Sequence, residues 1–181
     1  MKKEIKQIIQ IYQKGNISKD EFKVEINKQL NDFHHDIEKI FLEIANTKNS
    51  DEVEDLLTIL WAFDNPKEEI EILNKLLIAP WHKRHEDIIH AIQQIKNPES
   101  IPFIKKAIQQ KFQYLIDYGT GERQFINQSG HALASIGTQE ALDVIYELSK
   151  STDFVLKDEM LYRISKITGK NNHPKNYNLD V

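Results

Sequence analysis

The sequence predicts an all-α protein built from pairs of helices. Three observations lead to this fold class. Apolar residues recur at intervals of three and four along most of the 181-residue chain, which is the spacing of one helix face. Glycine and proline are scarce, at 6 and 5 residues, whereas a sandwich or barrel needs many tight turns. A pattern of helix, turn and helix also recurs, so we expect the helix pairs to repeat.

The N-terminal segment, residues 1–48, is expected to form a helical hairpin that packs on the repeats. Its first helix is short and amphipathic, and Gly15 ends it. Ser18 and Glu21 match a capping box, in which each side chain bonds the backbone N–H of the other residue. The helix that starts there is expected to run to about Asn46 along a narrow apolar seam.

Residues 49–169 are expected to hold the repeats. Gly137 and Gly169 fit the glycine position that follows a helix. The apolar pattern includes Trp61, interpreted as a core residue. In the last helix it consists of Phe154, Leu156, Leu161, Ile164 and Ile167. It predicts helices at about residues 53–63, 70–77, 82–96, 99–116, 122–136, 142–148 and 154–168. Residues 170–181 show little periodicity and are expected to form a flexible tail.

Internal similarity supports the repeats. One shift of the sequence against itself lays His90-Ala91-Ile92 over His131-Ala132-Leu133. A second shift lays the turn Asn65-Pro66 over the turn Asn97-Pro98. No single helix pair of this kind can bury its apolar face alone, so we expect the pairs to stack.

The segments 90–102 and 131–142 resemble HEAT-repeat proteins, in the short form common among bacterial proteins. The resemblance covers roughly residues 50–168 and implies a right-handed α-α superhelix with residues 1–48 as an extension. The turn of that family usually carries Asp-Pro or Gly-Asp; Asn97-Pro98 is close to it and Gly137-Thr138 is less so. The family includes scaffolds, lyases, hydroxylases and inhibitors, so the resemblance implies a fold and not one function.

Composition excludes several function classes. The absence of cysteine excludes thiol catalysis, thiolate metal sites and disulfides. The formal net charge of −4 gives no general attraction to nucleic acid, which we do not expect as a partner. No secretion signal or membrane span is visible, so we expect a cytoplasmic protein with no membrane partner. The sequence does not indicate an oligomeric state.

One predicted helix, residues 82–96, carries a candidate metal site. His82, Glu86 and His90 are spaced by four and would share one face, where two nitrogens and a carboxylate could bind a divalent ion. His85 would lie apart, at the edge of the core. The alternative is an ordinary solvated helix face, which we prefer because no second ligand cluster completes a site. A metal-dependent enzyme that uses His82, His85, Glu86 and His90 stays the alternative function.

Two resemblances to enzymes are incomplete in this sequence. Arg84-His85-Glu86 is similar to the His-Glu motif of deoxyhypusine hydroxylase, a di-iron HEAT-repeat enzyme that needs several such pairs. Here His85-Glu86 is the only His-Glu dipeptide. HEAT-like DNA glycosylases use a basic cleft with aromatic residues, but the lysines near Trp81 alternate with Glu and Gln as on a solvated face. We therefore expect no catalytic residue and no cofactor.

The leading hypothesis is a non-catalytic module that binds another protein. In stacked helix pairs the second helices line the concave surface, where such arrays usually bind their partners. Several of these residues are acidic, which favours a basic partner, and a bacterial immunity or adaptor protein is one concrete form. The candidate binding residues are Glu68, Glu71, Lys105, Gln109, Glu140, Asp143, Tyr146 and Glu147.

Overall fold

The computed structural model describes residues 1–63 and 66–169, apart from the side chains of residues 66–68. Every regular element in that part of the chain is a helix, so the all-α class is confirmed. Contacts divide the chain into two compact units, the first ending at Arg84 and the second starting at His85. The predicted boundary near residue 48 stays a prediction. The turn residue Asn65 and the predicted tail lie outside the described residues.

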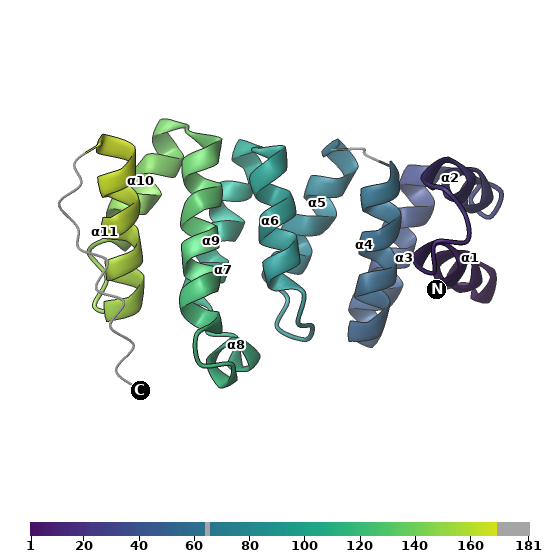
Figure 1. Cartoon of the computed structure of the whole chain (residues 1–181), viewed down its shortest axis with the longest axis horizontal. Coiled ribbons are helices and arrows are strands. Elements are labelled where there is room, and N and C mark those ends of the chain that lie inside the picture. The colour runs from purple at the N-terminus through teal and green to yellow at the C-terminus, as the bar shows by residue number, and fades with distance from the viewer. Residues whose placement is uncertain (64–65, 170–181) are drawn as a thin grey trace. The chain divides into compact units, whose positions relative to one another are not determined.

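The first unit contains five α-helices (Figure 1): α1 (Lys3–Gln13), α2 (Lys19–Asn27), α3 (Phe33–Thr47), α4 (Ser50–Phe63) and α5 (Pro66–Leu77). Helix α4 contacts α1, α2 and α3, and α3 also contacts α5. Each helix turns its apolar face inward, so that Ile9, Phe22, Ile44, Leu56 and Leu73 have no solvent exposure. The core therefore joins the N-terminal segment to the helices that follow it.

The predicted long helix from residue 18 to residue 46 is wrong, because the chain breaks between α2 and α3. Asp32 caps α3 by accepting a hydrogen bond from the backbone N–H of His35 at 2.8 Å. The Asp36 carboxylate accepts the backbone N–H groups of Asn31 and Asp32 at 2.7 and 3.3 Å. These short polar side chains give the backbone partners outside a helix, and this outweighs the continuous apolar periodicity.

Other local signals behave as expected. Ser18 and Glu21 form the capping box, with the Ser18 N–H donating to Glu21 at 2.8 Å and the Glu21 N–H donating to Ser18 Oγ at 3.3 Å. Gly137 ends its helix at φ 71°, a left-handed conformation that favours glycine. Asn97 accepts the backbone N–H of Glu99 at 2.9 Å and so starts the turn that Pro98 continues.

The second unit contains α6 (His85–Ile95), the 3-10 helix η1 (Pro98–Ser100), α7 (Ile101–Gln109), α8 (Gln113–Asp117), α9 (Gly121–Ile136), α10 (Gln139–Leu148) and α11 (Phe154–Thr168). Helix α9 is central and contacts α6 on one side and α11 on the other (Figure 1). Helices α7 and α10 form a second layer behind α9 and contact each other. This unit thus consists of stacked helices in two layers.

Two predicted helices of this region have different bounds in the structure. The helix expected over residues 82–96 begins at His85, and the helix expected over 99–116 is divided into η1, α7 and α8. The second break falls at Phe112, whose backbone is extended. Phe112 is 4% exposed, and the centroid of its ring lies 3.7 Å from the centroid of the His85 ring. Burial of this aromatic side chain therefore accompanies the break.

The apolar pattern also misplaced some side chains. Trp61, interpreted as core, is 41% exposed, and Phe154 at the start of α11 is 74% exposed. Leu161 and Ile167 are exposed as well. Leu156 is buried as the pattern predicts, but the rest of the inner face of α11 consists of Met160 and polar side chains, because this face pairs with polar groups of α9.

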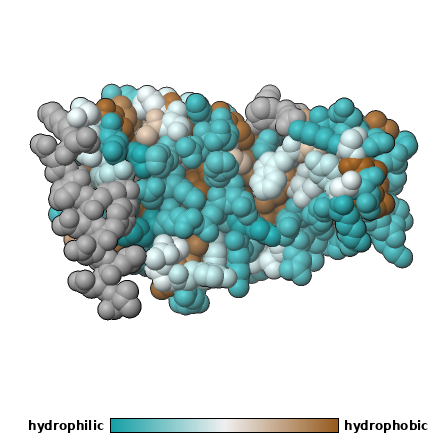
Figure 2. All heavy atoms as spheres, viewed as in Figure 1, coloured by the Kyte–Doolittle hydropathy of each residue, from teal (hydrophilic) through white to brown (hydrophobic). Residues whose placement is uncertain are grey.

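The visible surface is mostly hydrophilic, with apolar residues in scattered patches (Figure 2). This follows from the helix periodicity, which turns most large apolar residues inward. None of the helices in the described part of the chain is long and apolar enough to cross a membrane.

Candidate binding face and pocket

His82 lies in the segment that precedes α6, not on the helix as predicted. Its ring is 2% exposed and both nitrogens are engaged: Nε2 lies 2.8 Å from the Leu76 carbonyl oxygen, and Nδ1 accepts the Arg84 N–H at 3.0 Å. Since Nδ1 accepts, Nε2 carries the proton and donates to Leu76. Burial lowers the pKa of His82, so the neutral ring is favoured. This arrangement is a structural use of histidine that closes the turn after α5.

His85 is the first residue of α6 and is fully buried. Its Nδ1 lies 2.9 Å from the Tyr114 hydroxyl, and its ring also approaches the Phe125 ring edge-on. Burial raises the pKa of Tyr114 to about 12, so that hydroxyl keeps its proton at ordinary pH. His85, predicted at the edge of the core, thus lies inside an aromatic cluster formed with Phe112, Tyr114 and Phe125.

The candidate metal site does not form as the spacing suggested. His82 precedes α6, so His82, Glu86 and His90 do not share one helix face. Glu86 is half-buried, and its Oε1 has no hydrogen-bond partner among the described residues. Its burial and the charge of Asp87 raise its pKa. His90 is exposed. Within the described residues, no group of three or more His, Asp or Glu side chains could hold a metal ion.

The structure brings together six of the candidate binding residues, all in the second unit. Glu140, Asp143, Tyr146 and Glu147 are exposed on α10. Their spacing puts them on one side of that helix. Lys105 and Gln109 come from the neighbouring helix α7, and Lys105 Nζ forms an ion pair of 2.7 Å with Glu147. We call these six residues the α10 face.

The other two candidates belong to the first unit. Glu71 is exposed on α5 and pairs with Lys75 at 2.8 Å. Glu68 is also part of α5, but its side chain lies outside the described residues. Neither residue is therefore part of the α10 face as defined here.

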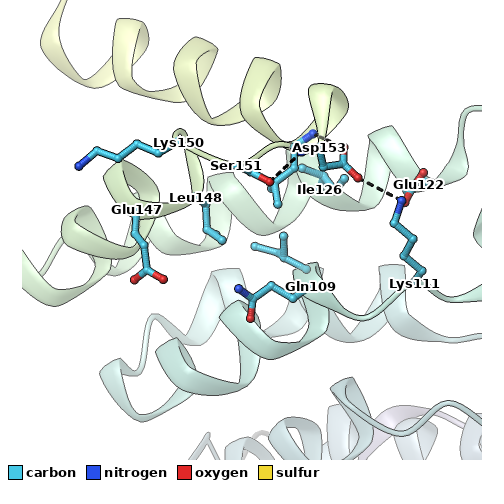
Figure 3. Close-up of a pocket in the computed structure, with 11 residues that line it drawn as sticks. Gln109, Lys111, Glu122, Ile126, Glu147, Leu148, Lys150, Ser151 and Asp153 are labelled. Carbon is cyan, nitrogen blue, oxygen red and sulfur yellow. Dashed lines mark hydrogen bonds and ion pairs between the residues drawn. The ribbon is translucent and has the colours of Figure 1, made fainter.

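A pocket of about 370 Å³ adjoins the α10 face and was not expected from the sequence (Figure 3). Its floor consists of apolar side chains of α7, α9, α10 and α11. The remaining lining residues are polar or charged and form its rim. The floor residues are Ile108, Ile126, Leu148 and Leu156; the rim residues are Gln109, Lys111, Glu122, Glu147, Lys150, Ser151 and Asp153.

The rim has an ion-pair cluster on one side. Lys111 Nζ lies 3.0 Å from Asp153 and 3.5 Å from Glu122. The hydrogen bond to Asp153 and the charges of both carboxylates raise the pKa of Lys111. Asp153 also caps α11 by accepting a hydrogen bond from the Leu156 N–H at 3.1 Å. This bond is the main cause that lowers the pKa of Asp153, and the hydrogen bond from Lys111 is the second. Gln109 and Glu147 lie on the other side of the pocket (Figure 3).

Sequence reasoning found Gln109 and Glu147 but missed the rest of the rim. Lys111, Ser151 and Asp153 lie in or beside the connections between helices, where apolar periodicity carries no signal. The one available local signal was Asp153, which stands directly before a predicted helix as a capping residue does.

Fold and site together define an all-helical protein whose second unit carries an exposed acidic face beside a partly apolar pocket. Comparison of the chain with protein-family models, with curated proteins and with solved structures gives no match. The resemblance to HEAT repeats therefore rests on the sequence pattern alone.

Proposed function

We propose that this chain is a protein-binding module that uses the α10 face, and that its helix pairs are HEAT-like and continue into a superhelix. The observation that carries the proposal is the exposure of Tyr146 among carboxylates, next to a pocket. Tyr146 is 43% exposed, and Glu140, Asp143 and Glu147 share its helix. Aromatic residues such as tyrosine are enriched at protein interfaces relative to the rest of the surface.

Charge indicates the kind of partner. The α10 face carries three carboxylates and one lysine, Lys105, which already pairs with Glu147. The chain as a whole carries a formal net charge of −4. An acidic face steers association with a basic surface and disfavours acidic ones. A basic protein is therefore the partner that fits, and a bacterial immunity or adaptor protein of the cytoplasm is the concrete form we propose.

The test is a pull-down from the native host with the intact chain and with a double charge reversal, Glu140→Lys with Asp143→Lys. Both residues are exposed and lie outside the pocket lining. Because like charges across an interface repel, we expect capture of the partner to fall about tenfold or more. The captured protein is identified by mass spectrometry and its binding is then measured with purified components.

A matched control exists in the same unit. Asp117 accepts a hydrogen bond from Gln113 four residues earlier at 2.8 Å, as Asp143 does from Gln139 at 2.7 Å. The variant Glu99→Lys with Asp117→Lys makes the same change of net charge on exposed residues. Capture should survive in this control. Equal loss in both variants, or no loss in either, would show that the α10 face is not the contact surface.

A further inference from the structure

The pocket beside the α10 face is a candidate site for one side chain of the partner. Its volume of about 370 Å³ lies at the small end of the range of ligand sites, roughly 300–1,000 Å³. Its four floor residues are each less than a tenth exposed and come from four different helices. Helices on all sides fix these residues, so the floor is a preformed apolar surface.

The charges of the rim favour a cation. Three carboxylates face two lysines around the pocket. Lys111 is already held between Glu122 and Asp153, at 3.5 and 3.0 Å. Glu147 binds Lys105 through Oε2, and a carboxylate has about four lone-pair sites, so it can accept further hydrogen bonds.

The charge of Lys150, unlike that of the paired Lys111, opposes a cation at the rim. Lys150 is exposed and forms no ion pair with any residue in the described part of the chain. In Figure 3 its ammonium points away from Leu148 and Ile126, whereas the neighbouring Glu147 side chain extends in another direction, toward the side where Gln109 lies. A cation that enters beside Glu147 therefore meets a carboxylate before it meets the Lys150 ammonium.

We propose that this pocket binds the side chain of an arginine presented by the protein partner, an inference that rests on the proposed function. The aliphatic stem would cover the apolar floor, as long charged side chains do on apolar surface. The guanidinium would donate to Glu147 and to the Gln109 side-chain oxygen. Arginine fits better than lysine because its planar fork bonds a carboxylate through two parallel N–H groups and is less strongly hydrated.

The experiment titrates the full chain with acetyl-Gly-Arg-Gly-amide and follows the methyl NMR signals of Ile126, Leu148 and Leu156. Three matched peptides replace the arginine by citrulline, by lysine and by norleucine. We expect the floor methyl signals to shift with the arginine peptide, and its affinity to exceed that of the citrulline peptide about fivefold, the effect of one partly exposed ion pair. Glu147→Gln should lower the arginine affinity by a similar factor, and Glu99→Gln should leave it unchanged.

Several outcomes would overturn the arginine assignment. If the citrulline or norleucine peptide binds as tightly as the arginine peptide, the apolar floor alone provides the affinity. If the lysine peptide binds as tightly as the arginine peptide, the planar guanidinium contributes nothing to the preference. If no peptide shifts the floor methyls, or Glu147→Gln changes nothing, the pocket does not bind this side chain. Partner capture tested with Glu140→Lys and Asp143→Lys does not involve the pocket lining, so the proposed function can stand when this inference fails.

Discussion

At the scale of single residues, His82 shows how a histidine that resembles a ligand can serve the fold. Its two ring nitrogens bond the Leu76 carbonyl and the Arg84 N–H, and burial lowers its pKa. A group whose pKa is lowered in the folded state stabilises the protein fully above its unfolded pKa, about 6.5 for histidine. This stabilising contribution is lost as the pH falls from the unfolded pKa through the lowered pKa of the folded state.

We therefore expect His82→Leu to lower the free energy of unfolding by about 1–3 kcal/mol at pH 8, because two buried backbone groups lose their partners. The gap to the unmodified chain should shrink as the pH falls below about 6.5, since protonation removes the acceptor at Nδ1. Urea unfolding at several pH values measures this. His90→Gln, at an exposed position, is the control and should change little at any pH. A gap independent of pH would contradict the lowered pKa of His82.

Two glycines of α9 make a matched pair. A Cβ at Gly121 would lie 2.8 Å from the backbone oxygen of Leu115, which cannot move away easily. A Cβ at Gly130 would lie 3.0 Å from Cε of Met160, the end of a flexible side chain. The same substitution should therefore have different effects at the two positions.

Gly121→Ala is expected to destabilise the protein by about 1–3 kcal/mol, the usual effect of overpacking. Gly130→Ala should stay within about 1 kcal/mol of the unmodified chain, because the better helix propensity of alanine offsets the small shift of Met160. Thermal and urea unfolding of both variants test the difference. Equal losses at the two sites would mean that the Leu115 contact is not decisive.

At the scale of elements, the contact between α9 and α11 combines apolar and charged groups. Glu159 is 2% exposed and accepts hydrogen bonds from Arg123 at 2.9 Å and from Asn127 at 2.6 Å. Arg123 also pairs with Asp158 at 2.9 Å. The buried carboxylate of Glu159 is tolerated because these partners satisfy it, and removing Glu159 takes a hydrogen-bond acceptor from both of them.

Glu159→Ala should lower the free energy of unfolding by about 2–4 kcal/mol, because Asn127 loses its acceptor and Arg123 keeps only Asp158, both at half-buried positions. A double-mutant cycle with Asn127→Ala measures the coupling, which we expect to exceed about 0.5 kcal/mol for side chains in one network. Additive effects would show that the 2.6 Å contact contributes nothing of its own.

The same helix shows what apolar periodicity can and cannot predict. It predicted a helix over residues 154–168, and the helix is there. It could not predict which side faces α9, because that side contains Glu159 and Arg163, whose burial depends on partners more than 20 residues away. Phe154 and Leu161, which the pattern favoured for the core, are exposed as a result.

Helix ends were predictable where a local side chain determines them. Ser18, Gly137 and Asn97 act through groups a few residues away, and each was identified. The breaks at Asp32 and Phe112 were missed because apolar residues continue through both at helical spacing. Four of the six residues of the α10 face lie on one helix and could be inferred from its spacing, whereas the floor of the pocket needs four helices in place and could not.

At the scale of the whole molecule, buried and capping carboxylates make opposite contributions to stability. Asp36 accepts two backbone N–H groups, from Asn31 and Asp32, and these bonds lower its pKa. Asp55 is half-buried, and this burial raises its pKa. The charge of Lys6 opposes the shift, whereas neighbouring carboxylates such as Glu52 add to it. At neutral pH the charge of Asp36 therefore stabilises the fold, while the charge of Asp55 destabilises it.

Replacing Asp36 or Asp55 by asparagine should show whether each charge stabilises or destabilises the fold. At pH 7 we expect Asp36→Asn to be less stable than the unmodified chain and Asp55→Asn to be more stable. Both differences in the free energy of unfolding should narrow in acid, as the aspartates become protonated. The difference for Asp55→Asn narrows as the pH falls through the raised pKa of Asp55 toward the ordinary value near 4. The difference for Asp36→Asn narrows below that ordinary value, because the pKa of Asp36 is lowered. Urea unfolding between pH 7 and about pH 3.5 measures both curves. If Asp55→Asn were destabilising at neutral pH, the attraction between the charges of Asp55 and Lys6 would outweigh the burial of Asp55.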